Sequence, residues 1–95
     1  MAKPVVFTAK KYSLLKIKWF DSQGCSGWQR KDKNVLESMT VMPVESAGFY
    51  LKVDDVSITI TDSVADQGKP DEQYRGFLTI PKAAILEIKV LNVLW

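Results

Sequence analysis

The sequence predicts an all-β (mainly β) protein, folded as one small, strongly bent barrel of five strands. Several short segments alternate apolar and polar residues with a period of two, which is typical of half-buried strands. Turn-forming residues separate these segments, and no long segment has the helical period. Five strands in 95 residues are too few for a two-sheet sandwich of about seven, whereas closing a single sheet removes its exposed edges.

Residues 12–20 are predicted as the first strand because apolar and basic residues alternate along them. We expect residues 1–11 to form an N-terminal arm and residues 92–95 an apolar tail of a single domain that spans residues 1–95. The apolar face of the first strand would carry Leu15, Ile17 and Trp19, and its polar face Lys16 and Lys18.

A long irregular insertion, residues 28–42, is predicted after the first strand and a Gly- and Ser-rich loop. Within it, residues 34–39 fit either one helical turn or an irregular loop, and the sequence leaves these two readings open. Pro43 ends whatever precedes it, because proline lacks the amide proton that a continuing helix needs.

Residues 45–53 and 56–61 are predicted as two strands of a tight hairpin, joined by Asp54 and Asp55. In the first of these strands Tyr50 is out of phase with Phe49 and Leu51, so we expect Tyr50 to face outward. In the second strand, the expected inner face consists of Val56, Ile58 and Ile60.

The C-terminal third is predicted as a solvated loop (62–73), a strand (74–80) that bends at Gly76, and a last strand (85–91). Pro81 fits the start of a single 3₁₀ turn between the two strands, because its fixed φ suits a first helical position. Such a turn before the last strand is common in SH3-like and Sm-like barrels, and this analogy favours an SH3-like barrel.

Charge and composition exclude several classes of protein. The net charge is +2, which argues against strong binding of nucleic acid by bulk electrostatics, although residues 1–34 carry +6 and residues 35–95 carry −4. No run of eighteen apolar residues or secretory signal is present, so we expect no membrane span. The single cysteine, Cys25, favours a reducing, cytoplasmic location.

No catalytic or metal-binding set is recognisable. Histidine is absent, which removes the commonest general base and the commonest metal ligand. Asp54 and Asp55 are adjacent, so in a strand they would point to opposite faces. We therefore expect no enzyme activity, no cofactor, no metal and no small-molecule substrate.

The chain from Trp19 onward resembles a group of small, uncharacterised phage and prophage proteins. The resemblance implies a phage or prophage origin, a bacterial host and a small β-barrel, and it carries over no established activity. It rests on Trp19 with Asp21 and Ser22, Gly27 with Trp28, Ser46 with Gly48 and Phe49, Asp54 with Asp55, Ile58, Ser63, Gly76, the run 78–82, Ile85 and Ile88.

The apolar ends of the chain indicate a protein partner or self-association as a homo-oligomer. Four residues are the candidate interface: Val5, Phe7, Leu94 and Trp95. Full exposure of such side chains forgoes about 1.5–3 kcal/mol each. The tail either packs on its own barrel beside residues 5–7 or docks on another chain, and both readings stay open. The expected function is that of a non-enzymatic protein-binding or self-assembling barrel.

The alternative function is binding of nucleic acid by a surface of lysines and aromatic side chains. Aromatic rings can stack on bases while neighbouring cations contact phosphates. The candidate residues are Lys16, Lys18, Arg30, Lys31, Tyr50 and Lys52.

Overall fold

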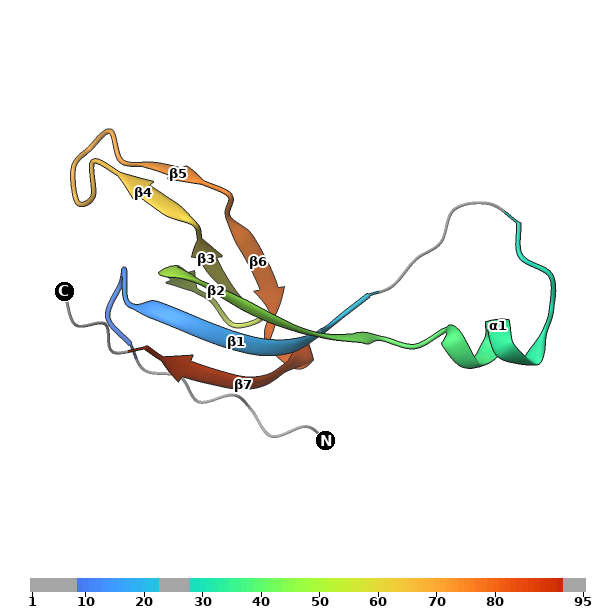
Figure 1. Ribbon diagram of the computed structural model, residues 1–95. Coiled ribbons are helices and arrows are strands. Elements are labelled where there is room, and N and C mark those ends of the chain that lie inside the picture. Colours follow the sequence, from blue (N-terminus) through green and yellow to red (C-terminus); the bar gives the residue numbers. More distant parts are fainter. Residues whose placement is uncertain (1–8, 23–27, 92–95) are drawn as a thin grey trace.

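A computed structural model describes residues 9–22 and 28–91. As predicted, the chain is mainly β (Figure 1). The described elements are β1 (Leu14–Asp21), α1 (Lys33–Ser38), β2 (Met42–Val53), β3 (Ser57–Thr61), β4 (Ser63–Ala65), β5 (Gln73–Arg75), β6 (Leu78–Pro81), the 3₁₀ turn η1 (Lys82–Ala84) and β7 (Ile85–Val90). Five strands form one antiparallel sheet in the order β6-β3-β2-β1-β7, and β4 and β5 form a second, two-stranded sheet.

The prediction for β1 is confirmed. Leu15, Ile17 and Trp19 are buried, and Lys16 and Lys18 alternate with them on the opposite face. β1 lies between β2 and β7 in the sheet, so its apolar face is at the centre of the core. The core cluster comprises Leu15, Ile17, Trp19, Tyr50, Ile58, Ile60, Ile80 and Ile85.

β2 is the longest of the described strands, and it pairs with two different strands along its length. From Met42 to Phe49 it pairs with β1, and from Phe49 to Val53 it pairs with β3. Gly48 lies at this change of partner: a Cβ atom added there would be 2.8 Å from the carbonyl oxygen of Thr61. Only glycine lets the two backbones approach so closely.

The expected outward orientation of Tyr50 is wrong. Its side chain is 9% exposed and belongs to the core, and it takes the inner face with Gly48 two residues before it. The register of β2 against β3 shifts between Tyr50 and Lys52. Such a bulge changes the phase of alternation, so the alternation of Phe49, Leu51 and Val53 was a misleading guide to the buried face.

The predicted turn at Asp54 and Asp55, between β2 and β3, is confirmed. One carboxylate oxygen of Asp54 accepts hydrogen bonds from the backbone N–H of Val56, at 2.9 Å, and of Ser57, at 2.8 Å. These two donors hold the pKa of the Asp54 carboxyl below its ordinary value. Val56 itself lies in the turn and is exposed, so it is not on the inner face of β3 as expected.

The predicted loop 62–73 contains additional structure. β4 and β5 pair antiparallel across it, and the single strand predicted for residues 74–80 is divided into β5 and β6. Gly76 interrupts it with a φ of 66°, a left-handed conformation that favours glycine. The bend predicted at Gly76 is therefore present, and it separates the small sheet from the large one.

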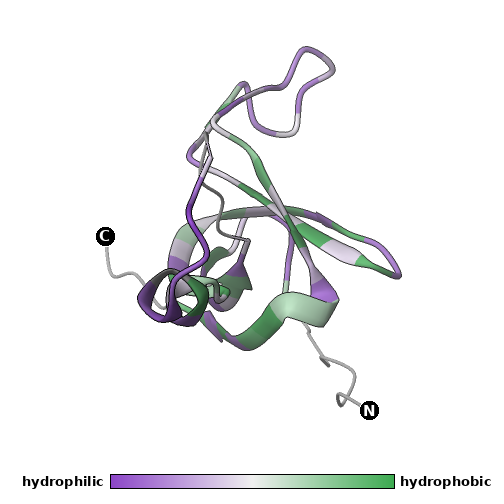
Figure 2. Cartoon of the chain, turned by 90° about the vertical axis from the view of Figure 1, so that its right-hand side faces the viewer, coloured by the Kyte–Doolittle hydropathy of each residue, from purple (hydrophilic) through white to green (hydrophobic). Residues whose placement is uncertain are grey.

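The connection between β6 and β7 forces the large sheet to curl. The two strands are at opposite ends of the strand order, yet only η1 joins them. Four residue steps span at most about 14 Å, whereas the edges of five flat strands would be about 19 Å apart. Viewed along the extension, the strands indeed curve around a common centre (Figure 2).

The sheet is curled but is not the closed barrel that was predicted. Among the described residues, β6 and β7 are its two ends and do not pair with each other. A short 3₁₀ turn before the last strand, with Pro81 as its N-cap, is present as predicted.

A long extension projects from the sheet between β1 and β2 (Figure 1). The extension is defined here as residues 28–41, and it carries α1. The radius of gyration of 16.8 Å exceeds the roughly 12 Å expected of a compact domain of this length. The molecule measures 53 × 31 × 28 Å along its principal axes, and the extension accounts for the longest of these dimensions.

We predict that Gly48→Ala destabilises the fold by about 1–3 kcal/mol, because the added methyl group meets backbone rather than a movable side chain. The midpoint of urea unfolding, followed by tryptophan fluorescence, measures this effect. Ala47→Ser, at an exposed position of the same strand, is the control and should change stability by less than about 0.5 kcal/mol. Equal stabilities of the two variants would contradict the close approach at Gly48.

Candidate functional site

The extension holds a short helix at a position that the sequence had left open. Asp32 is the N-cap of α1, and its side chain accepts a hydrogen bond of 2.7 Å from the backbone N–H of Asn34. A Lys33–Glu37 ion pair of 3.9 Å spans one turn. These local contacts start a helix of six residues, but they are worth only about 1 kcal/mol for the cap and less for the pair.

The apolar side chains of the extension are uncovered. Leu36 is 50% exposed and Met39 is 63% exposed, while Trp28 is fully exposed. Val41, Met42 and Phe20 continue this exposed apolar surface toward the sheet. A helix of this length without tertiary packing is marginal in water, so the extension has the properties of a segment that packs against something else.

A groove opens where the extension leaves the sheet. β2 pairs with β3 only from Phe49 onward, so its first half diverges from β3 and β6 and leaves a space between them. The groove has a volume of about 750 Å³, and its walls come from β1, β2 and β6. Trp19, Phe20, Asp21, Ser22, Val41, Val44, Ser46, Leu78, Thr79 and Pro81 line it.

Trp19 fixes the inner wall of the groove. Its indole N–H donates a hydrogen bond of 3.1 Å to the hydroxyl of Ser46 on the neighbouring strand. Val44 is directly opposite Trp19 in the β1–β2 ladder, and it packs on the core together with Leu78. The apolar wall therefore belongs to the core of the protein, and it remains open to solvent from the side of the extension.

The outer face of β1 carries mixed charges. Lys16 forms an ion pair of 3.5 Å with Glu45 on β2, and Lys18 is opposite Glu45 in one ladder and Glu87 in the other. On β7, Lys89 and Glu87 are paired at 3.3 Å. Because acids are interleaved with the lysines, this face is a poor platform for phosphates.

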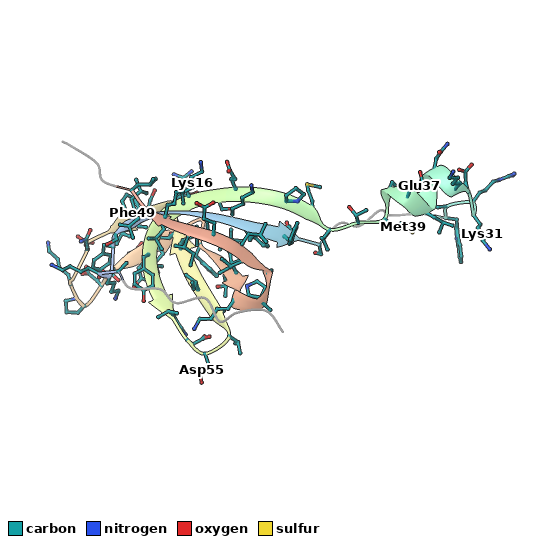
Figure 3. The ribbon with its side chains drawn as sticks, turned by 90° about the horizontal axis from the view of Figure 1, so that it is seen from below. Lys16, Lys31, Glu37, Met39, Phe49 and Asp55 are labelled. Carbon is teal, nitrogen blue, oxygen red and sulfur yellow. The ribbon has the colours of Figure 1, made fainter. Side chains whose placement is uncertain are left out.

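The six residues predicted to bind nucleic acid do not form one surface. Tyr50 is buried in the core. Lys16 lies over the sheet, whereas Lys31 is at the far end of the extension (Figure 3). Lys52 lies apart from both, in a second groove of about 470 Å³ that is also lined by the exposed Phe77. Two pairs of the predicted set stay together: Arg30 with Lys31 at exposed positions of the extension, and Lys16 with Lys18 among the acids on the outer face of β1.

A polar cluster around Glu72 was not predicted. One oxygen of its carboxylate accepts hydrogen bonds from the hydroxyl of Tyr12 and, at 2.8 Å, from the backbone N–H of Gly68. The other oxygen accepts from the hydroxyl of Tyr74 and is 3.9 Å from the ammonium of Lys11. These contacts join the β4–β5 hairpin to the chain that enters β1.

The cluster shifts the ionisation of its members. The N–H of Gly68 and the hydroxyls of Tyr12 and Tyr74 lower the pKa of Glu72 from its ordinary 4.5 to about 2. The same Glu72 raises the pKa of Tyr74. Because the carboxylate is fully occupied by donors from its own chain, the cluster holds the hairpin in place rather than offering a free ligand site. Separation by sixty residues hid this contact from the sequence.

The interface predicted at the chain ends lies outside the described residues. This applies to Val5, Phe7, Leu94 and Trp95, and also to Cys25. The terminal interface therefore remains a prediction.

We predict that Glu72→Gln lowers the midpoint of urea unfolding at pH 7. The midpoint of the variant should also change less than that of the wild type when the pH is lowered. A carboxyl with a folded pKa of about 2 stabilises the native state fully above its ordinary 4.5. This contribution is lost as the pH falls from about 4.5 to about 2. The difference between wild type and variant should therefore shrink over that window.

Asp71→Asn is the matched control, since Asp71 is exposed on the same hairpin. It should follow the wild-type acid profile. A Glu72→Gln profile parallel to that of the wild type down to pH 2 would show that Glu72 does not hold the hairpin.

No family model, curated protein or solved structure matches this chain. Within residues 9–22 and 28–91, no helix is long and apolar enough to cross a membrane. The same residues contain no group of three or more Cys, Asp or Glu side chains placed to hold a metal ion.

Proposed function

We propose that this protein is a small, non-enzymatic protein of phage or prophage type that acts in the cytoplasm of a bacterial host by binding protein, either another protein or further copies of itself. The single observation that carries this proposal is the uncovered apolar extension. Leu36 on the six-residue helix α1 and Met39, the C-cap residue of that helix, are both exposed. Burial of that surface by a partner would supply the stability that the helix lacks.

We also propose that the curled five-stranded sheet is a variant of the SH3-like (Sm-like) barrel. Consecutive antiparallel pairing of β1, β2, β3 and β6, with β7 returning beside β1, supports it. The single 3₁₀ turn between β6 and β7 also fits such a barrel, as does the sharp change of partner along β2. In this description the extension is a long insertion between the first two barrel strands.

We predict that Leu36→Asp combined with Met39→Asp abolishes association. The two apolar side chains would each contribute about 1.5–3 kcal/mol when buried, so their loss should weaken binding by roughly a hundredfold or more. Sedimentation velocity over a concentration series measures self-association. Photo-crosslinking from a benzophenone amino acid at position 36, in host cells, detects other proteins.

Asn34→Asp combined with Thr40→Asp adds the same two charges at exposed positions of the same segment and should leave association intact. A chain that ends at Leu91 tests the proposed terminal interface of Leu94 and Trp95 in the same assay. A wild-type protein that stays monomeric and captures nothing through position 36 would refute binding through the extension.

Nucleic-acid binding is a second candidate, and the tip of the extension favours it. Trp28 is exposed there beside Arg30 and Lys31, and neither cation has an ion-pair partner among the described residues. An aromatic ring next to two free cations is the composition that binds single strands. This site replaces the dispersed six-residue set.

We predict that Arg30→Ala combined with Lys31→Ala reduces any binding of single-stranded oligonucleotides and lowers the salt dependence of the affinity. The slope of log affinity against log salt should fall by about one per cation removed. Filter binding at several salt concentrations measures both quantities. Lys16→Ala with Lys18→Ala should have little effect, because those lysines lie among acids. Equal losses in the two double variants would exclude the tip as the site.

A further inference from the structure

We propose that the extension binds a second copy of this chain, in a two-fold dimer in which each extension lies across the groove of the other copy. This inference rests on the proposed function and names the partner. It assigns α1 as the inserting element and the groove of about 750 Å³ as its acceptor.

The placement of the two features makes them self-complementary. Phe20 and Val41 line the groove, and they are also at the base of the extension, so every extension begins at its own groove. The extension runs away from the sheet (Figure 1). When two extensions run antiparallel, the α1 of each copy comes to the base of the other. One two-fold axis then generates both contacts, which is the rule for isologous dimers.

The helix end and the groove are both apolar, and the spacing of the helix's apolar residues suits docking into a groove. Leu36 lies in α1 and Met39 is its C-cap residue, three positions further along, which is the spacing of neighbours on one side of a helix. Helices dock into apolar grooves through anchors at this spacing. The groove offers Trp19, Val44 and Leu78 as its apolar wall, and its volume lies within the range of about 300–1,000 Å³ that is usual for binding sites.

Charges at the two sites are complementary. Arg30 and Lys31 precede α1, and Asp21 lies in the groove. None of the three has an ion-pair partner among the described residues. The antiparallel arrangement carries the two cations of one copy toward the acid of the other.

The size of the contact is sufficient for a stable dimer. Besides the control positions Asn34 and Thr40, the extension supplies twelve residues, and the groove has nine lining residues besides Val41, which belongs to both. Each copy thus offers twenty-one residues. A standard protein interface uses about 20–30 residues on each side. The same surface folded back on its own chain would leave Leu36 and Met39 buried, whereas both are exposed.

Disulfide trapping between two different variants tests this dimer. Cys25, the only cysteine, is first replaced by serine so that each variant has one thiol. Met39→Cys protein is then mixed with Val44→Cys protein and oxidised, and the mixed dimer is quantified by mass spectrometry. Thr79→Cys, at an exposed position of the groove rim, provides a second acceptor should Val44→Cys fail to fold.

The expected result is a mixed disulfide formed several-fold faster with Val44→Cys or Thr79→Cys than with Lys69→Cys, which lies on the distant β4–β5 hairpin. Trapping no faster than with Lys69→Cys would overturn the proposal. A monomeric wild type would also overturn it, yet capture of another protein through position 36 would in that case uphold the proposed function. If the wild type is dimeric but Met39→Cys forms no mixed disulfide with either groove variant, the copies associate through a different surface and the proposal is wrong.

Discussion

The change of partner along β2 is the constraint on which the rest of this structure depends. One strand pairs with β1 over its first half and with β3 over its second half, and Gly48 permits the backbone of Thr61 to approach at the change. This bend lets a single sheet curl tightly enough for three residues of 3₁₀ turn to join its two edges. It also separates the first half of β2 from β3, which opens the groove and releases the extension from the sheet.

The functional surface follows from the same bend. Buried Trp19 and half-buried Val44 line the groove, because no described strand pairs with the first half of β2 on that side. Opposite charges are interleaved elsewhere on the sheet, as with Lys16 and Glu45, and the carboxylate of Glu72 is saturated by its own chain. Six exposed apolar side chains nevertheless follow one another along the extension and its base, where a protein partner would bury them together: Phe20, Trp28, Leu36, Met39, Val41 and Met42.

Local patterns predicted the local elements well. Alternation of apolar and polar residues predicted β1, β3 and β7. Turn-forming residues predicted the turn at Asp54 and the 3₁₀ turn that follows Pro81. The sequence could not reveal that a bulge after Tyr50 reverses which face of β2 is buried, because alternation gives a phase only while the strand is regular. It equally could not reveal the contact of Tyr12 with Glu72 or the groove, since both depend on residues far apart in the chain. Arg30 and Lys31 could be identified as a pair because they are adjacent in the sequence. Their distance from Lys16 depends on the extension, so it could not be predicted from the sequence.

The most direct test of the account is an isotope-filtered nuclear Overhauser experiment on a mixture of labelled and unlabelled protein. We expect intermolecular cross-peaks from the methyl group of Met39 to the indole of Trp19 and the methyl groups of Val44, with the remaining core contacts intramolecular. Intermolecular cross-peaks that involve only other surfaces, or none at concentrations where the protein is dimeric, would contradict the claim that the bend of β2 creates a groove for the extension of a second copy.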